Sequence, residues 1–279
     1  MSQQTFIELS DGNRIPQVGL GTWQLSSTSM PAVIDAALAA GYRHFDTAYA
    51  YRNESALGDA LKASGVERSE LFVTSKLPNG RHGYDETLRT FDETMANLGL
   101  DTLDLYLIHW PMPQTGNFVD TFKAFISLKE QGRISSIGVS NFHQPHLEKL
   151  IAETGVVPVV NQIELSPVFQ QKALRAFNDK HGIRTESWSP LGKGRVLDNS
   201  TIAAIAEKHG KTAGQVVIRW HIENGFIVIP KSANPERIAE NFAVFDFALD
   251  EDDMDRIGRM DDAGGRTGVN PDEGEFLQV

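Results

Sequence analysis

The sequence lacks cysteine entirely over its 279 residues, and it lacks long hydrophobic runs. Without cysteine, neither a disulfide framework nor a thiolate metal site can form. No apolar run approaches the roughly 20 residues that a membrane-spanning helix needs. The first residues, Met-Ser-Gln-Gln-Thr-Phe, show neither a basic region nor an apolar core, so no secretory signal is predicted. We therefore expect a cytoplasmic protein that does not bind membranes.

Positive charge is also scarce. There are 26 Lys and Arg against 37 Asp and Glu, which gives a net charge of −11. This balance argues against nucleic acid as a partner, and an anionic ligand would need a local basic pocket. The eight His are scattered, and His143 and His146 have no evident third ligand, so we predict no metal site. A hydrolase is not indicated either, because no nucleophile-elbow motif is present.

Short apolar runs alternate with helical segments along the whole chain. Helical periodicity is clearest over 30–40, 85–98 and 118–130. The expected strands are 18–20, a short one at Phe45, 71–73, 105–108, 134–139, 156–162, 183–188 and 226–229. Eight strands alternating with helices in a chain of this length predict an α/β fold, a single (β/α)8 TIM barrel that forms one domain over 1–279. Segments 5–9 and 14–16 flank a turn, which predicts an amino-terminal β-hairpin that closes the bottom of the barrel.

Polar side chains follow three of these strands. Asp46 ends one strand with Tyr51 just beyond it, Lys76 ends the next, and His109 ends the third. In a TIM barrel, the carboxyl ends of the strands form one rim, which carries the chemistry. An acid, a phenol, an ammonium and an imidazole would meet there, and such groups can move a proton to or from a carbonyl oxygen. Taken singly, each of these residue types is more often a packing residue or part of a structural ion pair, and their joint position on one rim favours the catalytic interpretation.

A nucleotide would have to bind this rim, because the sequence has neither a G-x-G-x-x-G fingerprint nor a phosphate-binding P-loop. Lys231, Ser232 and Arg237 form a local basic cluster in an acidic protein. Asn234 and Pro235 are typical of the start of a helix, whose amino terminus attracts anions. The cluster therefore suits a phosphate monoester, although an ordinary capped surface helix would give the same pattern. The segment 192–195, Gly-Lys-Gly-Arg, is weaker evidence for a pyrophosphate loop.

Four segments resemble the aldo-keto reductases. The first is Gly41-Tyr42-Arg43-His44-Phe45-Asp46-Thr47-Ala48, with Tyr51, Glu54 and Gly58 beyond it. The others are Leu107-Ile108-His109-Trp110-Pro111, Gly138-Val139-Ser140-Asn141-Phe142, and Ile229-Pro230-Lys231-Ser232 with Arg237, Glu240 and Asn241. Among the branches of that family, the chain is most similar to the bacterial 2,5-diketo-D-gluconate reductase and broad-specificity aldehyde reductase group.

The resemblance implies NADPH-dependent reduction of aldehydes and ketones. Tyr51 would be the acid that protonates the developing alkoxide, Lys76 and Asp46 would tune it, and His109 would position the substrate oxygen. A free Tyr titrates near 10, and a neighbouring cation is expected to lower that pKa. The cofactor residues implied by the resemblance are Gly21, Thr22, Asp46, Ser140, Asn141, Gln162, Trp188, Ser189, Leu191, Gly192, Lys231, Ser232, Arg237, Glu240 and Asn241.

Within that set, Trp188 would stack on the nicotinamide, Ser140, Asn141 and Gln162 would bind its carboxamide, and Lys231, Ser232 and Arg237 would bind the 2′-phosphate. The substrate would meet Trp23, Tyr51, His109 and Trp110. Trp188 stands where many relatives have Tyr, and Trp23 where Tyr or Phe is common. The segment 110–117 is short, which favours an open pocket and small aldehydes, α-dicarbonyls and keto-sugars as substrates.

Two other functions fit the same residues. A regulatory barrel that binds the nucleotide without turnover would keep Lys231 and Arg237 but would not need Tyr51 and His109. A Schiff-base lyase would use Lys76 as a nucleophile. We expect a monomer, with a small-molecule carbonyl compound as its only partner.

Overall fold

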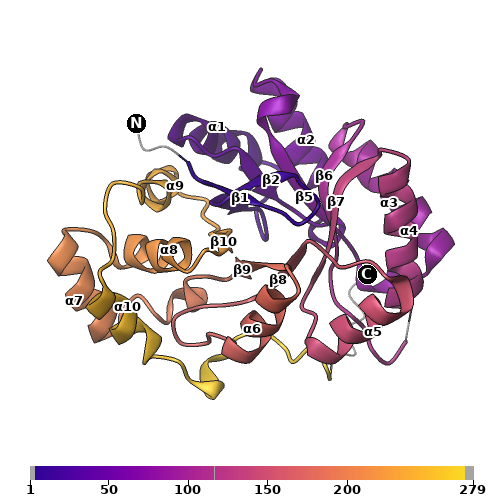
Figure 1. Ribbon diagram of the computed structural model, residues 1–279. Coiled ribbons are helices and arrows are strands. Elements are labelled where there is room, and N and C mark those ends of the chain that lie inside the picture. The colour runs from indigo at the N-terminus through magenta and orange to yellow at the C-terminus, as the bar shows by residue number, and fades with distance from the viewer. Residues whose placement is uncertain (1–3, 116, 274–279) are drawn as a thin grey trace.

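The computed structural model describes residues 4–115 and 117–273, and a ring of eight parallel strands lies at its centre (Figure 1). The strands follow one another around the ring in chain order. They are β3 (Gly19–Gly21), β4 (His44–Asp46), β5 (Phe72–Leu77), β6 (Leu103–Ile108), β7 (Ile134–Ser140), β8 (Val160–Glu164), β9 (Arg184–Trp188) and β10 (Ile227–Val228). A parallel bridge between Val18 and Val228, with Gly21 N donating to Pro230 O at 3.2 Å, closes the ring.

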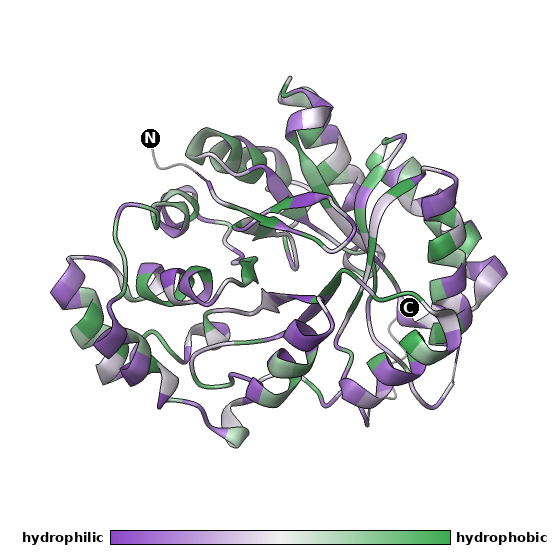
Figure 2. Cartoon of the chain, viewed as in Figure 1, coloured by the Kyte–Doolittle hydropathy of each residue, from purple (hydrophilic) through white to green (hydrophobic). Residues whose placement is uncertain are grey.

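Helices surround the strands on the outside (Figure 1). The first five are α1 (Met30–Ala40), α2 (Glu54–Ala63), α3 (Tyr84–Leu98), α4 (Phe118–Glu130) and α5 (Gln144–Thr154). They are followed by α6 (Lys172–Lys180), α7 (Ser200–His209), α8 (Ala213–Glu223), α9 (Pro235–Phe242) and α10 (Glu251–Gly258). Figure 2 shows hydrophobic colour on the central strands and both colours on the helices, because each helix buries one face against the sheet. The predicted (β/α)8 barrel is confirmed.

The hairpin predicted at the amino terminus is also present. Strands β1 (Phe6–Glu8) and β2 (Arg14–Pro16) pair antiparallel. Leu9 and Ile15 of the hairpin pack with Phe72, Leu105 and Val160, which lie in the strands of the barrel. Asn13 Nδ2 donates to Ser135 O at 3.1 Å and Arg184 Nε to Glu8 O at 2.8 Å, both at the starts of barrel strands. The hairpin therefore covers the amino-terminal end and leaves the opposite rim free for the site.

Four elements differ from the sequence prediction. Helices α2 and α10 were not predicted, because each has only a narrow apolar stripe among charged residues. The strand predicted over 156–162 begins only at Val160 and ends at Glu164. The strand predicted over 71–73 extends to Leu77, so Lys76 lies inside β5 and is fully buried. No helix in the described part of the chain is long and apolar enough to cross a membrane.

Candidate active site

A cavity of about 250 Å³ opens at the carboxyl ends of the barrel strands. It is lined by Gly21, Trp23, Asp46, Tyr51, His109, Trp110, Ser140, Asn141, Gln162, Trp188, Ser189, Pro190, Lys193, Ile229, Lys231, Gly268 and Val269. All four predicted substrate residues and eight of the fifteen predicted cofactor residues are in this set, counting Asp46 among the latter. The expected convergence of strand ends on one rim is thus observed.

The loop after β4 places Tyr51. Thr47 Oγ1 donates to Asn53 Oδ1 at 3.0 Å, and Asn53 Nδ2 donates to the carbonyls of Thr22 at 2.9 Å and Leu25 at 3.2 Å. These bonds tie the loops after β3 and β4 together. Between them, the single 3-10 turn Tyr49–Tyr51 carries the phenol to the mouth of the barrel. A short turn held at both ends restricts the position of the phenol.

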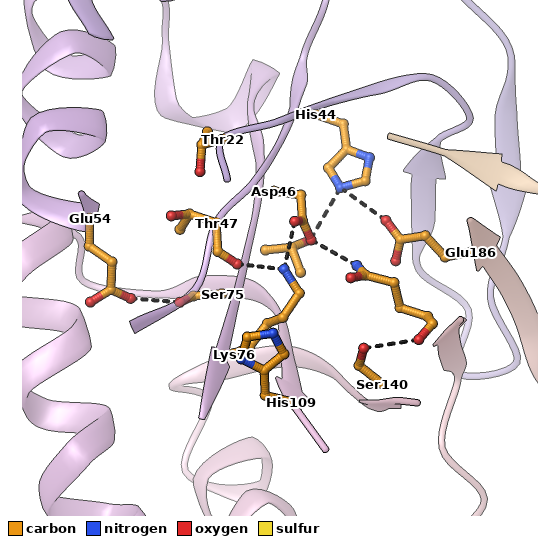
Figure 3. A network of polar contacts seen from close by, with 12 residues as sticks. Thr22, His44, Asp46, Thr47, Glu54, Ser75, Lys76, His109, Ser140 and Glu186 are labelled. Carbon is orange, nitrogen blue, oxygen red and sulfur yellow. Dashed lines mark hydrogen bonds and ion pairs between the residues drawn. The ribbon is translucent and has the colours of Figure 1, made fainter. Parts of the chain in front are cut away.

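Lys76 and Asp46 form a buried ion pair beneath Tyr51. Lys76 Nζ donates to Asp46 Oδ1 at 2.6 Å and to Thr47 O at 2.7 Å, as Figure 3 shows. Gln162 Nε2 donates to the other oxygen, Asp46 Oδ2, at 2.8 Å. The ammonium lies 5.1 Å from the centre of the Tyr51 ring. Burial opposes the charge on Lys76, but the Asp46 carboxylate outweighs it and raises the pKa of Lys76 above its ordinary value.

The expected fall in the pKa of Tyr51 is wrong, although Lys76 does act in the expected direction. Burial raises the pKa of Tyr51, and this effect exceeds the lowering caused by the Lys76 cation. The net pKa of Tyr51 therefore lies above its ordinary value. The prediction overlooked the desolvation of a phenol held against a closed barrel interior. Tyr51 thus keeps its proton over the whole neutral range, as a proton donor must.

His109 stands beside Tyr51. The two rings meet edge to face with their centres 5.7 Å apart. Burial lowers the pKa of His109 to about 3, and the nearby Lys76 cation adds to this. His109 is therefore neutral, with one ring N–H that can donate to a substrate oxygen without adding charge to the site.

The three predicted carboxamide-binding residues form one network. Asn141 Nδ2 donates to Ser140 Oγ at 3.1 Å, and Ser140 Oγ donates to Gln162 O at 2.9 Å. Asn141 Oδ1 accepts from Trp188 Nε1 at 2.8 Å, which fixes the indole at the cavity wall. Asn141 has a φ of 63°, a left-handed conformation that Asn tolerates better than most residues.

Two features fit a flat aromatic ring against this wall. The indole of Trp188 lines the cavity and can stack on such a ring. Thr22 Oγ1 is buried and has no hydrogen-bond partner within the described residues, although both its chain neighbours line the cavity. Thr22 itself lies just behind the cavity wall, and a buried hydroxyl without a partner is unfavourable until one pairs with it. The residues present thus fit a nicotinamide.

The predicted phosphate-binding cluster lies at the start of α9. Asn234 caps this helix, with Oδ1 accepting from Arg237 N at 2.9 Å. Lys231 and Arg237 are both exposed, and neither side chain forms an ion pair with any residue that the structure describes. Lys231 also lines the cavity, which connects the basic cluster to the site. Two uncompensated cations at a helix amino terminus suit a phosphate.

The remaining predicted cofactor residues do not line the cavity itself. They are Thr22, Leu191, Gly192, Ser232, Arg237, Glu240 and Asn241. Glu240 accepts from Thr212 Oγ1 at 2.7 Å, and Ser232 Oγ bonds within its own turn to Asn234. The sequence reasoning missed Pro190, Ile229, Gly268 and Val269. Only Gly268 and Val269 lie far from every motif, so no sequence signal could have found them.

Comparisons with known proteins identify the family of this chain. The sequence pattern of the Aldo/keto reductase family matches residues 17–262. This chain belongs to the aldo/keto reductase family. It is 57% identical to an aldo-keto reductase of Mycolicibacterium smegmatis, over 95% of this chain and 96% of that one. It is 51% identical to the methylglyoxal reductase DkgA of Salmonella typhimurium, over 98% and 99%.

Solved structures of similar proteins confirm the fold. A variant of Gox0644, solved in complex with NADPH, superimposes with a TM-score of 0.95 at 54% identity, covering 98% of this chain and 100% of that one. The aldo/keto reductase from Brucella melitensis gives a TM-score of 0.91 at 53% identity, covering 94% and 99%. Family membership confirms the predicted oxidoreductase and removes the support for a regulatory barrel without turnover.

Proposed function

We propose that this aldo/keto reductase uses NADPH to reduce small aldehydes, α-dicarbonyls and keto-sugars to alcohols, with Tyr51 as the proton donor. The observation that carries the proposal is the phenol of Tyr51 beside neutral His109 and above the buried Lys76–Asp46 pair. The relatives support the cofactor and the substrate class. Gox0644 was solved with NADPH, and DkgA is named for methylglyoxal, a small α-dicarbonyl.

NADPH supplies a hydride to the carbonyl carbon when it is bound. The side chains of this protein bind and protonate the carbonyl oxygen of the substrate. The ring N–H of His109 holds the carbonyl oxygen, and the Tyr51 hydroxyl donates its proton as negative charge develops there. Lys76, which stays cationic, stabilises the phenolate left on Tyr51. Asp46 holds the Lys76 ammonium in place through the 2.6 Å bond.

The cavity supports small substrates. Trp23 and Trp110 provide flat apolar walls beside the polar pair of Tyr51 and His109. Trp23 is 46% exposed, so one side of the pocket is open to solvent. We further propose that the chain acts as one domain and as a monomer in the cytoplasm.

The decisive experiment is the variant Tyr51→Phe. We expect kcat for methylglyoxal to fall by roughly 10²–10⁴-fold, the usual contribution of a general acid, with unchanged NADPH affinity. Tyr49→Phe is the matched control, because Tyr49 lies in the same turn and its hydroxyl bonds to Glu93 at 2.6 Å on the surface. Near-normal turnover in Tyr51→Phe would refute the assignment.

The Schiff-base lyase is tested with borohydride. A nucleophilic Lys must be neutral, whereas Lys76 is fully buried against Asp46 with a raised pKa. We therefore expect no borohydride-trapped adduct on Lys76 in the presence of substrate, and mass spectrometry of the digested protein checks this.

A further inference from the structure

Glu186 is a second carboxyl group inside the barrel, behind the catalytic ion pair. It lies in β9, directly beside Gln162 of β8 in the strand register. Its side chain is fully buried, and neither oxygen makes a hydrogen bond with a residue in the described part of the chain. His44 lies beside it, with Nε2 at 3.8 Å from Glu186 Oε1. Figure 3 shows Glu186 and His44 on one side of Asp46 and Lys76 on the other.

The strand geometry explains why Glu186 points inward. Successive side chains of a strand alternate between the two faces. The flanking residues bond outward to the helices. Thr185 Oγ1 accepts from Asn178 of α6 at 3.1 Å, and Ser187 Oγ contacts His221 Nε2 of α8 at 3.0 Å. Glu186 therefore faces the closed interior, together with His44, Asp46 and Lys76.

No cation is available to pair with Glu186 among the described residues around it. The one buried cation facing it is Lys76, and Asp46 already takes that cation at 2.6 Å. His44 is neutral, because burial lowers its pKa to about 3, and its ring nitrogens lie near Pro16 O at 3.3 Å and Thr74 Oγ1 at 3.2 Å. Gln162 directs its amide to Asp46 Oδ2. An ionised Glu186 would thus be a second buried anion competing with Asp46 for one ammonium.

We propose that Glu186 is a positioning residue whose uncharged carboxyl lets Asp46 hold Lys76 beneath Tyr51, and whose ionisation at alkaline pH weakens the catalytic acid. The inference rests on the proposed role of Tyr51. Glu186 does not touch the cavity, so it acts through Asp46 and Lys76 and not on the substrate.

The electrostatics agree with this geometry. Burial raises the pKa of Glu186 to about 8, and the Asp46 carboxylate adds to the shift. The amide of Gln162 and the Lys76 cation oppose it, although the hydrogen bond of Gln162 itself goes to Asp46. An anionic Glu186 raises the pKa of Tyr51 further, so proton donation becomes harder once Glu186 ionises. The reductase should therefore lose rate as pH rises through about 8.

The test is a single-turnover pH profile of the NADPH-loaded enzyme with methylglyoxal, in the unchanged protein and in Glu186→Gln. We expect the unchanged enzyme to lose roughly three- to tenfold in rate between pH 7 and 9.5, since each unit added to the pKa of an acid costs up to about tenfold. The rate of Glu186→Gln at pH 7 should lie within about twofold of that of the unchanged enzyme. Between pH 7 and 9.5 its rate should fall much less than that of the unchanged enzyme. Glu186→Met should behave alike, because the carboxyl makes no hydrogen bond that must be replaced.

The matched control is Asp104→Asn. Asp104 is a partly buried carboxylate of β6 that pairs with Arg68 at 2.6 Å, away from Lys76, and its variant should keep the alkaline decline. An unchanged decline in both Glu186 variants overturns the proposal, as does a rate at pH 7 reduced more than tenfold in a folded variant.

A direct titration keeps the inference testable if the variants do not fold. In the unchanged protein labelled with carboxyl-¹³C glutamate, one resonance should titrate near pH 8. A protein in which every glutamate titrates below pH 7 would refute the proposal. This readout does not depend on Tyr51, and turnover by Tyr51→Phe would refute the assignment of the acid alone.

Discussion

At the scale of single residues, burial decides the protonation of Tyr51 and His109. It raises the pKa of Tyr51 against the pull of Lys76, and it lowers the pKa of His109 to about 3. Both groups are therefore uncharged at neutral pH, and the Lys76–Asp46 pair contains the charges. An uncharged phenol beside a buried ion pair is what the proposed proton donor requires.

Trp23 lines the cavity at its solvent-exposed side. We expect Trp23→Ala to reduce kcat/KM by roughly tenfold for methylglyoxal and by less for a bulky ketone, because the lost indole wall serves small ligands. The measurement is kcat/KM over substrates of graded size. Phe6→Ala is the control, since Phe6 is equally exposed at 46% but lies in β1 at the opposite end. A uniform loss that follows a lowered melting temperature would show that Trp23 only supports the structure.

Arg237 should distinguish NADPH from NADH. The variant Arg237→Ala should weaken NADPH binding by roughly tenfold or more, the value of one charge-assisted hydrogen bond to phosphate, and leave NADH binding nearly unchanged. Fluorescence titration with both cofactors measures this. Arg259→Ala removes another exposed Arg, just after α10, and should change neither affinity. An equal loss for NADPH and NADH would mean that Arg237 supports the helix and not the phosphate.

At the scale of elements, the segment that follows α10 crosses the mouth of the barrel. Glu164 Oε1, at the end of β8, accepts from Thr267 N and Thr267 Oγ1, each at 2.6 Å, and its Oε2 accepts from Gly268 N at 2.9 Å. Gly268 packs so closely on the Trp188 indole that a Cβ there would come within 2.5 Å of it. One carboxylate thus fixes a distant segment as a wall of the pocket.

Removing that carboxylate should loosen the wall. We expect Glu164→Ala to raise KM for methylglyoxal by about tenfold, because three hydrogen bonds to the segment are lost and each is worth about 1 kcal/mol or more. Steady-state kinetics measure KM, and kcat should change little because Tyr51 and Lys76 are untouched. Glu153→Ala is the control, because Glu153 is an exposed residue of α5, and this variant should leave KM unchanged. If KM stays the same, the segment does not contribute to the pocket.

At the scale of the whole molecule, buried neutral histidines make stability depend on pH. Burial lowers the pKa of His44 to about 3 and that of His221 to about 4, below the unfolded value near 6.5. Between these values the unfolded chain binds more protons, so stability is complete above about pH 6.5 and falls toward pH 4. Each of the two should cost roughly 2 kcal/mol at pH 5.

Urea denaturation at pH 5 and pH 7 measures this difference in the free energy of unfolding. Replacing His221 by Gln should make the difference smaller, because Gln cannot be protonated in the unfolded chain. An equal difference in the variant would show that other groups cause the loss of stability at low pH.

The sequence predicted that the proposed catalytic residues would lie together. Asp46, Lys76 and His109 each end an apolar run, and parallel strands bring such ends to one rim. The helix over 30–40 was predicted at its observed bounds, because Pro31 starts it and Gly41, at φ 113°, ends it. Helix α2 was missed because its apolar residues, Leu57 and Leu61, give too weak a periodic signal among polar neighbours.

The sequence alone determined which residues could do the chemistry, because strand periodicity and the polar strand ends are local properties of the chain. The tertiary structure decided which groups are charged and which segments meet. Desolvation depends on everything packed around a group, so the raised pKa of Tyr51 and the solitary carboxyl of Glu186 follow only from the closed barrel. Likewise, the contact of Gly268 with Trp188 joins residues 80 positions apart, and no local pattern encodes such a contact.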